Sequence, residues 1–126
     1  PESRIKTAIA ANAGLYTFPN RNLKYPYGIK NVEHGETLID QSFEKNLILL
    51  TAELDNDPNL GTFTTTKLAM DQGTNRLERG ANFYNASEKY ADDNNIPFNW
   101  EIDTVLNVGH DYRKMSENSI KWLSKF

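Results

Sequence analysis

An acidic residue and a histidine each follow a segment whose pattern is typical of a β-strand. Asp55 follows the apolar run at 47–53, and His110 follows the alternating run at 100–106. Functional side chains of an open parallel sheet gather beyond the carboxyl ends of its strands, where neighbouring backbones lie about 5 Å apart. If the two strands are neighbours, Asp55 and His110 can share a hydrogen bond. A carboxylate placed in this way holds the imidazole in one tautomer while the other ring nitrogen takes a proton from a nucleophile.

The third member of such a triad, a nucleophile on a sharp glycine-flanked turn, is not found in the sequence. There is no Gly-x-Ser-x-Gly motif, and none of the six serines lies on a glycine-flanked turn between a strand and a helix: Ser3, Ser42, Ser87, Ser116, Ser119 and Ser124. We therefore expect the nucleophile to lie outside this chain. The acid also has an alternative, since Asp57 lies two residues further along the same loop. Asp55 is preferred because it is the first acid able to leave the strand.

The hydropathy pattern predicts an α/β domain with a three-stranded parallel sheet and crossover helices. Strands are expected at 5–11, 46–53 and 99–106, an aromatic loop at 12–35, a long helix at 75–93 and a closing helix at 115–125. Two shorter helices are expected at 36–43 and 67–72. The alternation of strands and helices favours right-handed crossovers between parallel strands. The second strand contains a continuous apolar run at 47–50 and is expected at the centre. The third is expected at an outer position, and the first is expected to be buried on both faces.

The long helix is expected to bury an apolar face at helical spacing. Its predicted members are Leu77, Ala81, Phe83, Tyr84, Ala86, Tyr90 and Ala91. Arg76 and Arg79 could contact an acidic substrate group, but arginines on such a helix are more often solvated charges. We therefore expect both to face the solvent.

Composition excludes several classes of partner. The net charge of the 126 residues is −3 and no Lys/Arg stripe is present, so nucleic acid is not expected to bind. Cysteine is absent and only two histidines occur, which makes a metal site improbable, and His34 is assigned no role. We expect no metal and no cofactor. No apolar run is long enough to cross a bilayer and no signal segment is evident, so we expect a soluble chain without membrane contact.

Several motifs in order resemble the carboxyl-terminal half of bacterial α/β-hydrolases. The opening segment 1–14 resembles the strand after the nucleophile helix. Leu-Leu-Thr-Ala-Glu-Leu-Asp at 49–55 resembles the strand with the catalytic acid, and Val-Gly-His-Asp at 108–111 resembles the histidine loop. The segment 70–80 is similar to an excursion of one bacterial subgroup of serine hydrolases, and the chain from Met115 onward resembles the final helix. The resemblance covers nearly the whole chain.

The resemblance implies part of an esterase-like serine hydrolase that acts on a small ester or a related acyl bond. His110 would be the general base and Asp55 its orienter, and the isolated chain would be inactive because the nucleophile is missing. The first strand would pair through its open edge with a missing amino-terminal half or with a second copy. The chain starts at Pro1, without methionine, which also suggests a piece of a larger fold.

The loop after the first strand carries four aromatic residues, Tyr16, Phe18, Tyr25 and Tyr27. They could form the wall of a substrate pocket, although packing against the core is the more common role. The alternative to a hydrolase is a non-catalytic α/β module that binds a ligand or a protein through residues 15–28. Substitution of Tyr25 and Tyr27 would abolish binding in that case, whereas His110→Ala would not.

Overall fold

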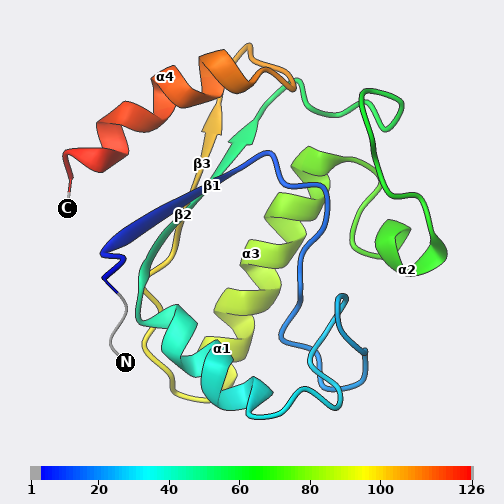
Figure 1. The fold of residues 1–126 in the computed structure, drawn as a ribbon, viewed down its shortest axis with the longest axis vertical. Helices are drawn as coiled ribbons and strands as arrows, with labels where there is room; N and C mark the ends of the chain where they lie inside the picture. Colours follow the sequence, from blue (N-terminus) through cyan, green and yellow to red (C-terminus); the bar gives the residue numbers. More distant parts are fainter. Residues whose placement is uncertain (1–3, 126) are drawn as a thin grey trace.

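A parallel three-stranded sheet forms the centre of the molecule. The computed structural model describes residues 4–125, and the chain order is β1 (Thr7–Ala11), α1 (Gly35–Phe43), β2 (Asn46–Ala52), α2 (Lys67–Met70), α3 (Arg76–Asp93), β3 (Glu101–Val105) and α4 (Tyr112–Leu123). The strands lie in the order β1-β2-β3, and both pairs are parallel (Figure 1). The predicted parallel sheet is confirmed, with β2 at the centre and β3 at an edge.

The closing helix begins three residues before its predicted start. Asp111 is the N-cap of α4, and its carboxylate accepts hydrogen bonds from the backbone amides of Arg113 (3.0 Å) and Lys114 (3.1 Å). An N-cap carboxylate satisfies amides that have no partner inside the helix. The helix therefore starts directly after the histidine loop. Residues 1–3 of the opening segment and Phe126 lie outside the described residues.

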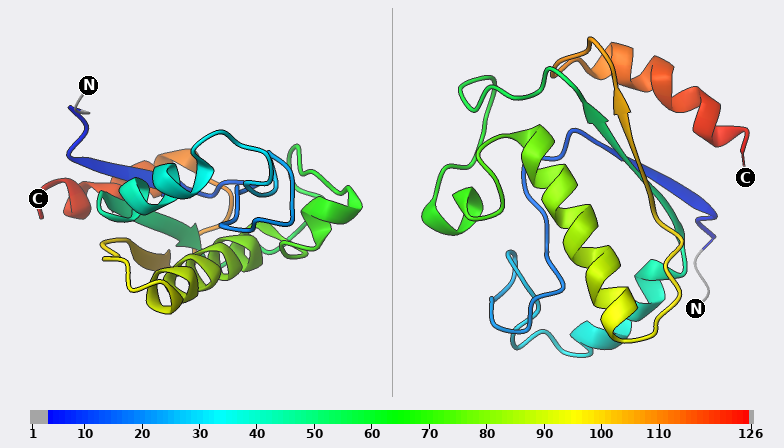
Figure 2. Two further views of the ribbon diagram at one scale, coloured as in Figure 1. Left: turned by 90° about the horizontal axis from the view of Figure 1, so that it is seen from below. Right: turned by 180° about the vertical axis from the view of Figure 1, so that it is seen from behind.

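Helices α3 and α4 cover opposite faces of β2. Leu49 packs in a cluster with Phe43, Phe83, Ala91 and Trp100, whereas the next residue, Leu50, packs with Ala52, Val105, Val108 and Met115. Successive side chains of a strand point to opposite faces, so this alternation places α3 on one side and α4 on the other (Figure 2). Both helices begin near the same end of the sheet, where β2 and β3 finish.

The prediction that the first strand is buried on both faces is wrong for the described residues. Every residue of β1 is half-buried or exposed, and Ile5, which precedes the strand, is 66% exposed. The physical reason is position: β1 lies at an edge of the sheet and pairs only with β2 among the described strands. The strand is therefore mostly apolar although none of its residues is fully buried.

The buried face of α3 also differs from the prediction. The buried residues of this helix are Arg76, Arg79, Gly80, Phe83, Ser87 and Ala91. The buried face includes Gly80 because α3 packs closely on β2 there: a Cβ at Gly80 would lie 2.8 Å from Thr51 Cγ2. The expectation that the two arginines face the solvent is wrong, since Arg76 is 4% exposed and Arg79 is 0% exposed.

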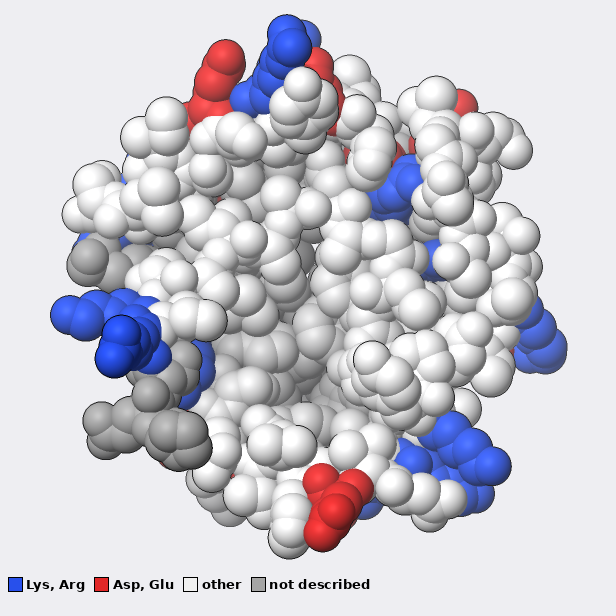
Figure 3. All heavy atoms as spheres, in the orientation of Figure 1, with Lys and Arg blue, Asp and Glu red and all other residues white. Residues whose placement is uncertain are grey.

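Charged side chains on the face seen in Figure 3 lie mostly toward its periphery, and uncharged atoms occupy its centre. Within residues 4–125, none of the helices has both the length and the apolar character needed to span a membrane.

Candidate active site

Asp55 lies in the turn that ends β2 and is almost completely buried, with 1% of its surface exposed. Its amide donates to the carbonyl of Ala52 (3.1 Å), and its carbonyl accepts from the amide of Leu77 (3.1 Å) in the first turn of α3. The acid is thus held between the end of the central strand and the beginning of the long helix. Both contacts are made by the backbone, so the side chain is free for other partners.

The histidine loop is attached to the same turn by three further hydrogen bonds. The amide of Glu53 donates to the carbonyl of Val105 (2.9 Å), and the amide of Leu54 donates to the carbonyl of Val108 (2.8 Å). The Glu53 carboxylate accepts from the amide of Asn107 (2.8 Å), a residue with a φ of 58°. The two loops therefore have a defined relative position even without the contact between Asp55 and His110.

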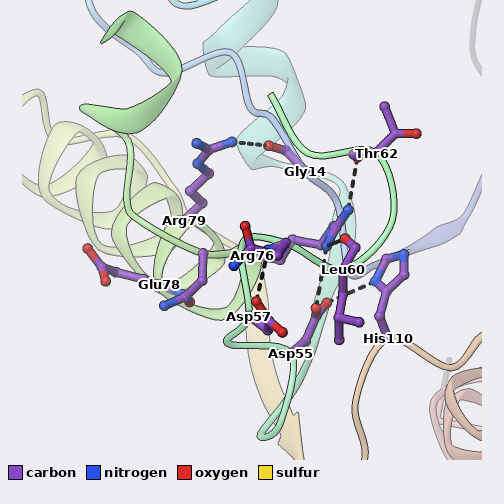
Figure 4. Close-up of polar contacts among 11 residues, drawn as sticks. Gly14, Asp55, Asp57, Leu60, Thr62, Arg76, Glu78, Arg79 and His110 are labelled. Atoms are coloured by element: carbon purple, nitrogen blue, oxygen red, sulfur yellow. Dashed lines mark hydrogen bonds and ion pairs between the residues drawn. The ribbon is translucent and has the colours of Figure 1, made fainter. Parts of the chain in front are cut away.

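Asp55 and His110 meet at the end of the sheet. The distance between Asp55 Oδ2 and His110 Nδ1 is 3.0 Å, the acid is buried, and the imidazole side chain is 41% exposed (Figure 4). An ionised carboxylate only accepts hydrogen bonds, so with Asp55 in that form the proton of this bond would lie on Nδ1. The other ring nitrogen, Nε2, makes no hydrogen bond with the described residues. This arrangement can hold one imidazole tautomer and leave Nε2 available to a reacting group.

Asp57 is not brought to the histidine. Its carboxylate accepts from the amide of Asn59 (2.9 Å), and its carbonyl accepts from the amide of Leu60 (3.3 Å). These short-range bonds are typical of an Asx-type turn. The structure thus pairs the preferred acid, Asp55, with His110 and gives Asp57 a local role.

The four loop aromatics do not form a common wall beside His110. Tyr16 stacks on Phe83, with 4.6 Å between ring centroids, and Phe18 also packs on Phe83. Tyr25 is 72% exposed, and the hydroxyl of Tyr27 hydrogen-bonds to Thr66 Oγ1 (3.1 Å). Burial, followed by the nearby charge of Asp55, raises the pKa of Tyr16 to about 12. Tyr16 and Phe18 therefore pack against the core, the more common of the two roles expected for these aromatics.

Two buried arginines, which were expected to face the solvent, organise the loop after the acid. Arg76 donates to the carbonyls of Leu60 and Thr62, both at 2.9 Å. Arg79 donates to the carbonyls of Gly73 (2.8 Å), Gly14 (2.7 Å) and Thr64 (2.8 Å). Both guanidiniums also lie over the ring of Phe63, at 5.1 and 3.9 Å from its centroid.

Burial, followed by repulsion from Arg76, lowers the pKa of Arg79 below its usual value. A signal in the sequence could have revealed the burial of both arginines. Arg76, Arg79 and Phe83 are spaced by three and four residues, so they share one face of α3.

His110 borders a pocket of about 410 Å³ between the end of β1 and the start of α4. The pocket is lined by Ile9, Ala11, Asn12, His110, Asp111, Tyr112, Met115, Ser116 and Ser119. No serine hydroxyl in residues 4–125 hydrogen-bonds to the imidazole; Ser119, for example, donates to the carbonyl of Ser116 (2.6 Å). In the same range, no three acidic or histidine side chains converge in a way that could hold a metal ion.

The parallel strand order, helices on both faces and a carboxylate and an imidazole at adjacent strand ends define a class of protein. The chain has the fold of the carboxyl-terminal part of the α/β-hydrolases. It is similar to poly(aspartic acid) hydrolase-1 from Sphingomonas sp. KT-1, with 37% sequence identity and a TM-score of 0.89 over 95% of this chain. It is also similar to LpqC, a poly(3-hydroxybutyrate) depolymerase from Bordetella parapertussis, with 28% identity and a TM-score of 0.84 over 95% of this chain.

These similarities confirm the predicted fold class and the predicted resemblance to α/β-hydrolases. The chain covers 46% of the Sphingomonas protein and 42% of the Bordetella protein, so it spans less than half the length of either. No protein-family model matches the chain, and no curated protein sequence matches it.

Proposed function

We propose that this chain supplies the acid and the base of a serine hydrolase that cleaves an ester or a related acyl bond. His110 is the general base and Asp55 the residue that orients it, while the serine nucleophile comes from a segment outside this chain. The observation that carries the proposal is the 3.0 Å contact between the buried Asp55 Oδ2 and the half-exposed His110 Nδ1. The similarity to two hydrolases supports it at the level of reaction class.

The proposed segment that carries the serine lies along the open edge of β1. Two observations support this position. The outer edge of β1 has no partner strand among the described residues, and the pocket beside His110 is lined on one side by Ile9 and Asn12 at the end of β1. A parallel strand added outside β1 would end at this pocket, because reacting groups gather beyond the carboxyl ends of parallel strands.

The test compares the two histidines in the polypeptide that carries this chain. Hydrolysis of p-nitrophenyl butyrate is measured for the unsubstituted protein, His110→Ala and His34→Ala. Because a positioned general base contributes about 10²–10⁴-fold, His110→Ala should lower kcat/KM by a factor in that range. His34 is a matched control, since its side chain is 77% exposed and does not line the pocket beside His110. Turnover that survives both His110→Ala and a fluorophosphonate inhibitor would contradict the proposal.

The substrate class is proposed from the names of the two similar proteins. One is named for the hydrolysis of poly(aspartic acid) and the other for that of poly(3-hydroxybutyrate). The proposed substrate is therefore a polymer linked by amide or ester bonds, and both polymers should be tested after the ester assay. The shortening of each polymer into oligomers, compared between the unsubstituted protein and His110→Ala, measures this hydrolysis.

The alternative function, a binding module that uses the aromatic loop, has no specific observation in its favour. Tyr16 and Phe18 are engaged with Phe83, so neither offers its ring to a ligand. Tyr25 is exposed but isolated from the pocket beside His110.

A further inference from the structure

Arg76 connects the acid to the loop that follows it. Its Nη1 lies 3.7 Å from Asp55 Oδ1, and both side chains are buried, at 4% and 1% exposure. The same Nη1 donates to the carbonyl of Leu60, and Nη2 donates to the carbonyl of Thr62. One guanidinium therefore contacts both the carboxylate and the loop backbone, as Figure 4 shows.

The two carboxylate oxygens of Asp55 have different surroundings. Oδ2 accepts the hydrogen bond from His110, whereas Oδ1 is buried and has no hydrogen-bond partner among the described residues. An ionised carboxylate removed from water is costly unless a charge or hydrogen bonds compensate it. At 3.7 Å, a distance longer than a hydrogen bond, the Arg76 guanidinium compensates the carboxylate through its charge.

We propose that Arg76 is a positioning residue for the Asp55–His110 pair, a role that rests on the proposed function. Its positive charge offsets the cost of burying the Asp55 carboxylate beside it. The carboxylate can then accept the proton of His110 Nδ1, and Nε2 stays open for the proton of the nucleophile. A neutral Asp55 would carry its own proton and would donate it to Nδ1. The ring proton would then lie on Nε2, the nitrogen that must be free to act as the base.

Arg79 is a matched control for this role. It lies one turn further along α3, is equally buried, donates to three loop carbonyls and lies over the same Phe63 ring as Arg76. No ion pair joins it to Asp55 among the described residues. Both arginines thus bind carbonyls of the loop. Of the two, Arg76 also places its positive charge beside the buried Asp55 carboxylate.

The experiment determines the tautomer of His110 by long-range ¹H–¹⁵N NMR in the unsubstituted protein, R76Q, R79Q and R76K. Glutamine removes the charge but keeps hydrogen-bond donors, and lysine keeps the charge without the planar fork. We expect the Nδ1–H tautomer in the unsubstituted protein, R79Q and R76K. In R76Q we expect the Nε2–H tautomer and loss of the downfield Nδ1 proton signal.

Two results overturn the proposal: R76Q keeps the Nδ1–H tautomer, or R79Q loses it to the same extent as R76Q. If R76Q does not fold, as its amide spectrum would show, R76K decides, since a Nε2–H tautomer with the charge retained contradicts a role of charge. These readouts need no turnover. If the protein is inactive but the His110 tautomer depends on Arg76, this inference is supported and the proposed function fails.

The kinetic readout adds a second criterion. If the hydrolase is active, R76Q should lower kcat by about 10²-fold, the typical effect of a misplaced catalytic group, and leave KM unchanged. A change in KM alone would contradict the positioning role, because it would place Arg76 in substrate binding. Hydrolysis that depends on His110 but not on Arg76 overturns this inference and leaves the proposed function supported.

Discussion

At the scale of single residues, the site depends on which of two nearby acids leaves the strand in the right direction. Asp55 and Asp57 have the same chemistry and lie two residues apart. The first is inserted between β2 and α3 by two backbone hydrogen bonds, whereas the second is turned back onto the amide of Asn59. Local hydrogen bonding therefore separates an acid that reaches the histidine from one that stabilises a turn.

The two acids should respond differently to the same substitution. Asp55→Asn leaves the shape of the side chain but presents a neutral amide to His110 Nδ1, so we expect kcat to fall by about 10²–10⁴-fold. Asp57→Asn can still accept from the Asn59 amide and should leave kcat unchanged. Steady-state hydrolysis of p-nitrophenyl butyrate measures both. An equal loss in the two variants would contradict a catalytic role for Asp55 that Asp57 does not share.

Tyr16 should make the stability of the protein sensitive to alkaline pH. Its pKa is raised to about 12 in the folded state, from 10.0. The neutral phenol is favoured by folding, so this contribution is fully present below pH 10 and is lost as the pH rises from 10 to 12. At 1.36 kcal/mol per pKa unit, the loss amounts to about 3 kcal/mol.

Urea unfolding as a function of pH measures this contribution. Tyr16→Phe should reduce the fall in the free energy of unfolding between pH 10 and 12. Tyr25→Phe is the control, because Tyr25 is 72% exposed and its hydroxyl is not buried by folding. If the two variants show the same alkaline profile, the burial of Tyr16 does not control it.

At the scale of elements, α3 determines how tightly the site is assembled. Its first turn holds the carbonyl of Asp55, Arg76 and Arg79 hold the loop after the acid, and Gly80 allows the helix to lie against β2. The helix begins at Arg76 because the side chain of Asn75 caps it by accepting from the amide of Glu78 (2.8 Å). A displacement of α3 would therefore move the acid loop as well.

Gly80→Ala should destabilise the protein even though alanine is the better helix former. The new methyl group would lie 2.8 Å from Thr51 Cγ2 and 3.3 Å from the Tyr16 hydroxyl. Overpacking of this kind costs about 1–3 kcal/mol, which exceeds the gain of about 1 kcal/mol in helix propensity. Chemical denaturation measures the difference.

A second substitution identifies the contact responsible. Thr51→Ser removes Cγ2 but keeps the hydroxyl that hydrogen-bonds to Thr104 Oγ1 (2.8 Å), so it should restore part of the stability lost in Gly80→Ala. Asn85→Ala, at an exposed position of the same helix, tests propensity alone and should be neutral or stabilising. A double variant no more stable than Gly80→Ala would exclude Thr51 as the obstacle.

At the scale of the whole molecule, the two edges of the sheet are proposed to have different surroundings. Both β1 and β3 are edge strands among the described residues. The proposed strand outside β1 would take the hydrogen bonds of its outward amides, while the outer edge of β3 has no such proposed partner. Hydrogen exchange can distinguish the edges because alternate amides of an edge strand point away from the sheet.

In the polypeptide that carries this chain, we expect the outward amides of 7–11 to exchange slowly and those of 101–105 to exchange fast. The inward amides of each strand, bonded to β2, are the internal reference. Fast exchange of the outward amides of β1 would contradict the proposed pairing. Sedimentation of the same sample separates a further strand of one polypeptide from pairing between two copies, which would double the mass.

Much of the architecture follows from patterns along the chain. The continuous apolar run 47–50 predicts a central parallel strand, because such a strand is covered on both faces, and β2 occupies that position. The order of strands and helices predicts the crossovers, and the positions of Asp55 and His110 after neighbouring strands predict their meeting. These features depend on local periodicity and on the regular geometry of a parallel sheet, both of which the sequence determines by itself.

Only the tertiary structure decided the environment of the acid. The shared helix face of Arg76, Arg79 and Phe83 indicates that the arginines could be buried, but it does not identify their partners. A guanidinium is stable inside only where backbone carbonyls or an anion surround it. Those groups come from loops distant in sequence, at 14 and at 55–64. Other features depend in the same way on contacts between distant segments. They are the choice between Asp55 and Asp57, the packing of Tyr16 and Phe18 on Phe83, and the hydrogen bond from the Asn107 amide to the Glu53 carboxylate. The sequence by itself determined the sheet and the two reacting groups, and the fold decided what surrounds them, because burial and long-range hydrogen bonds exist only once the chain is assembled.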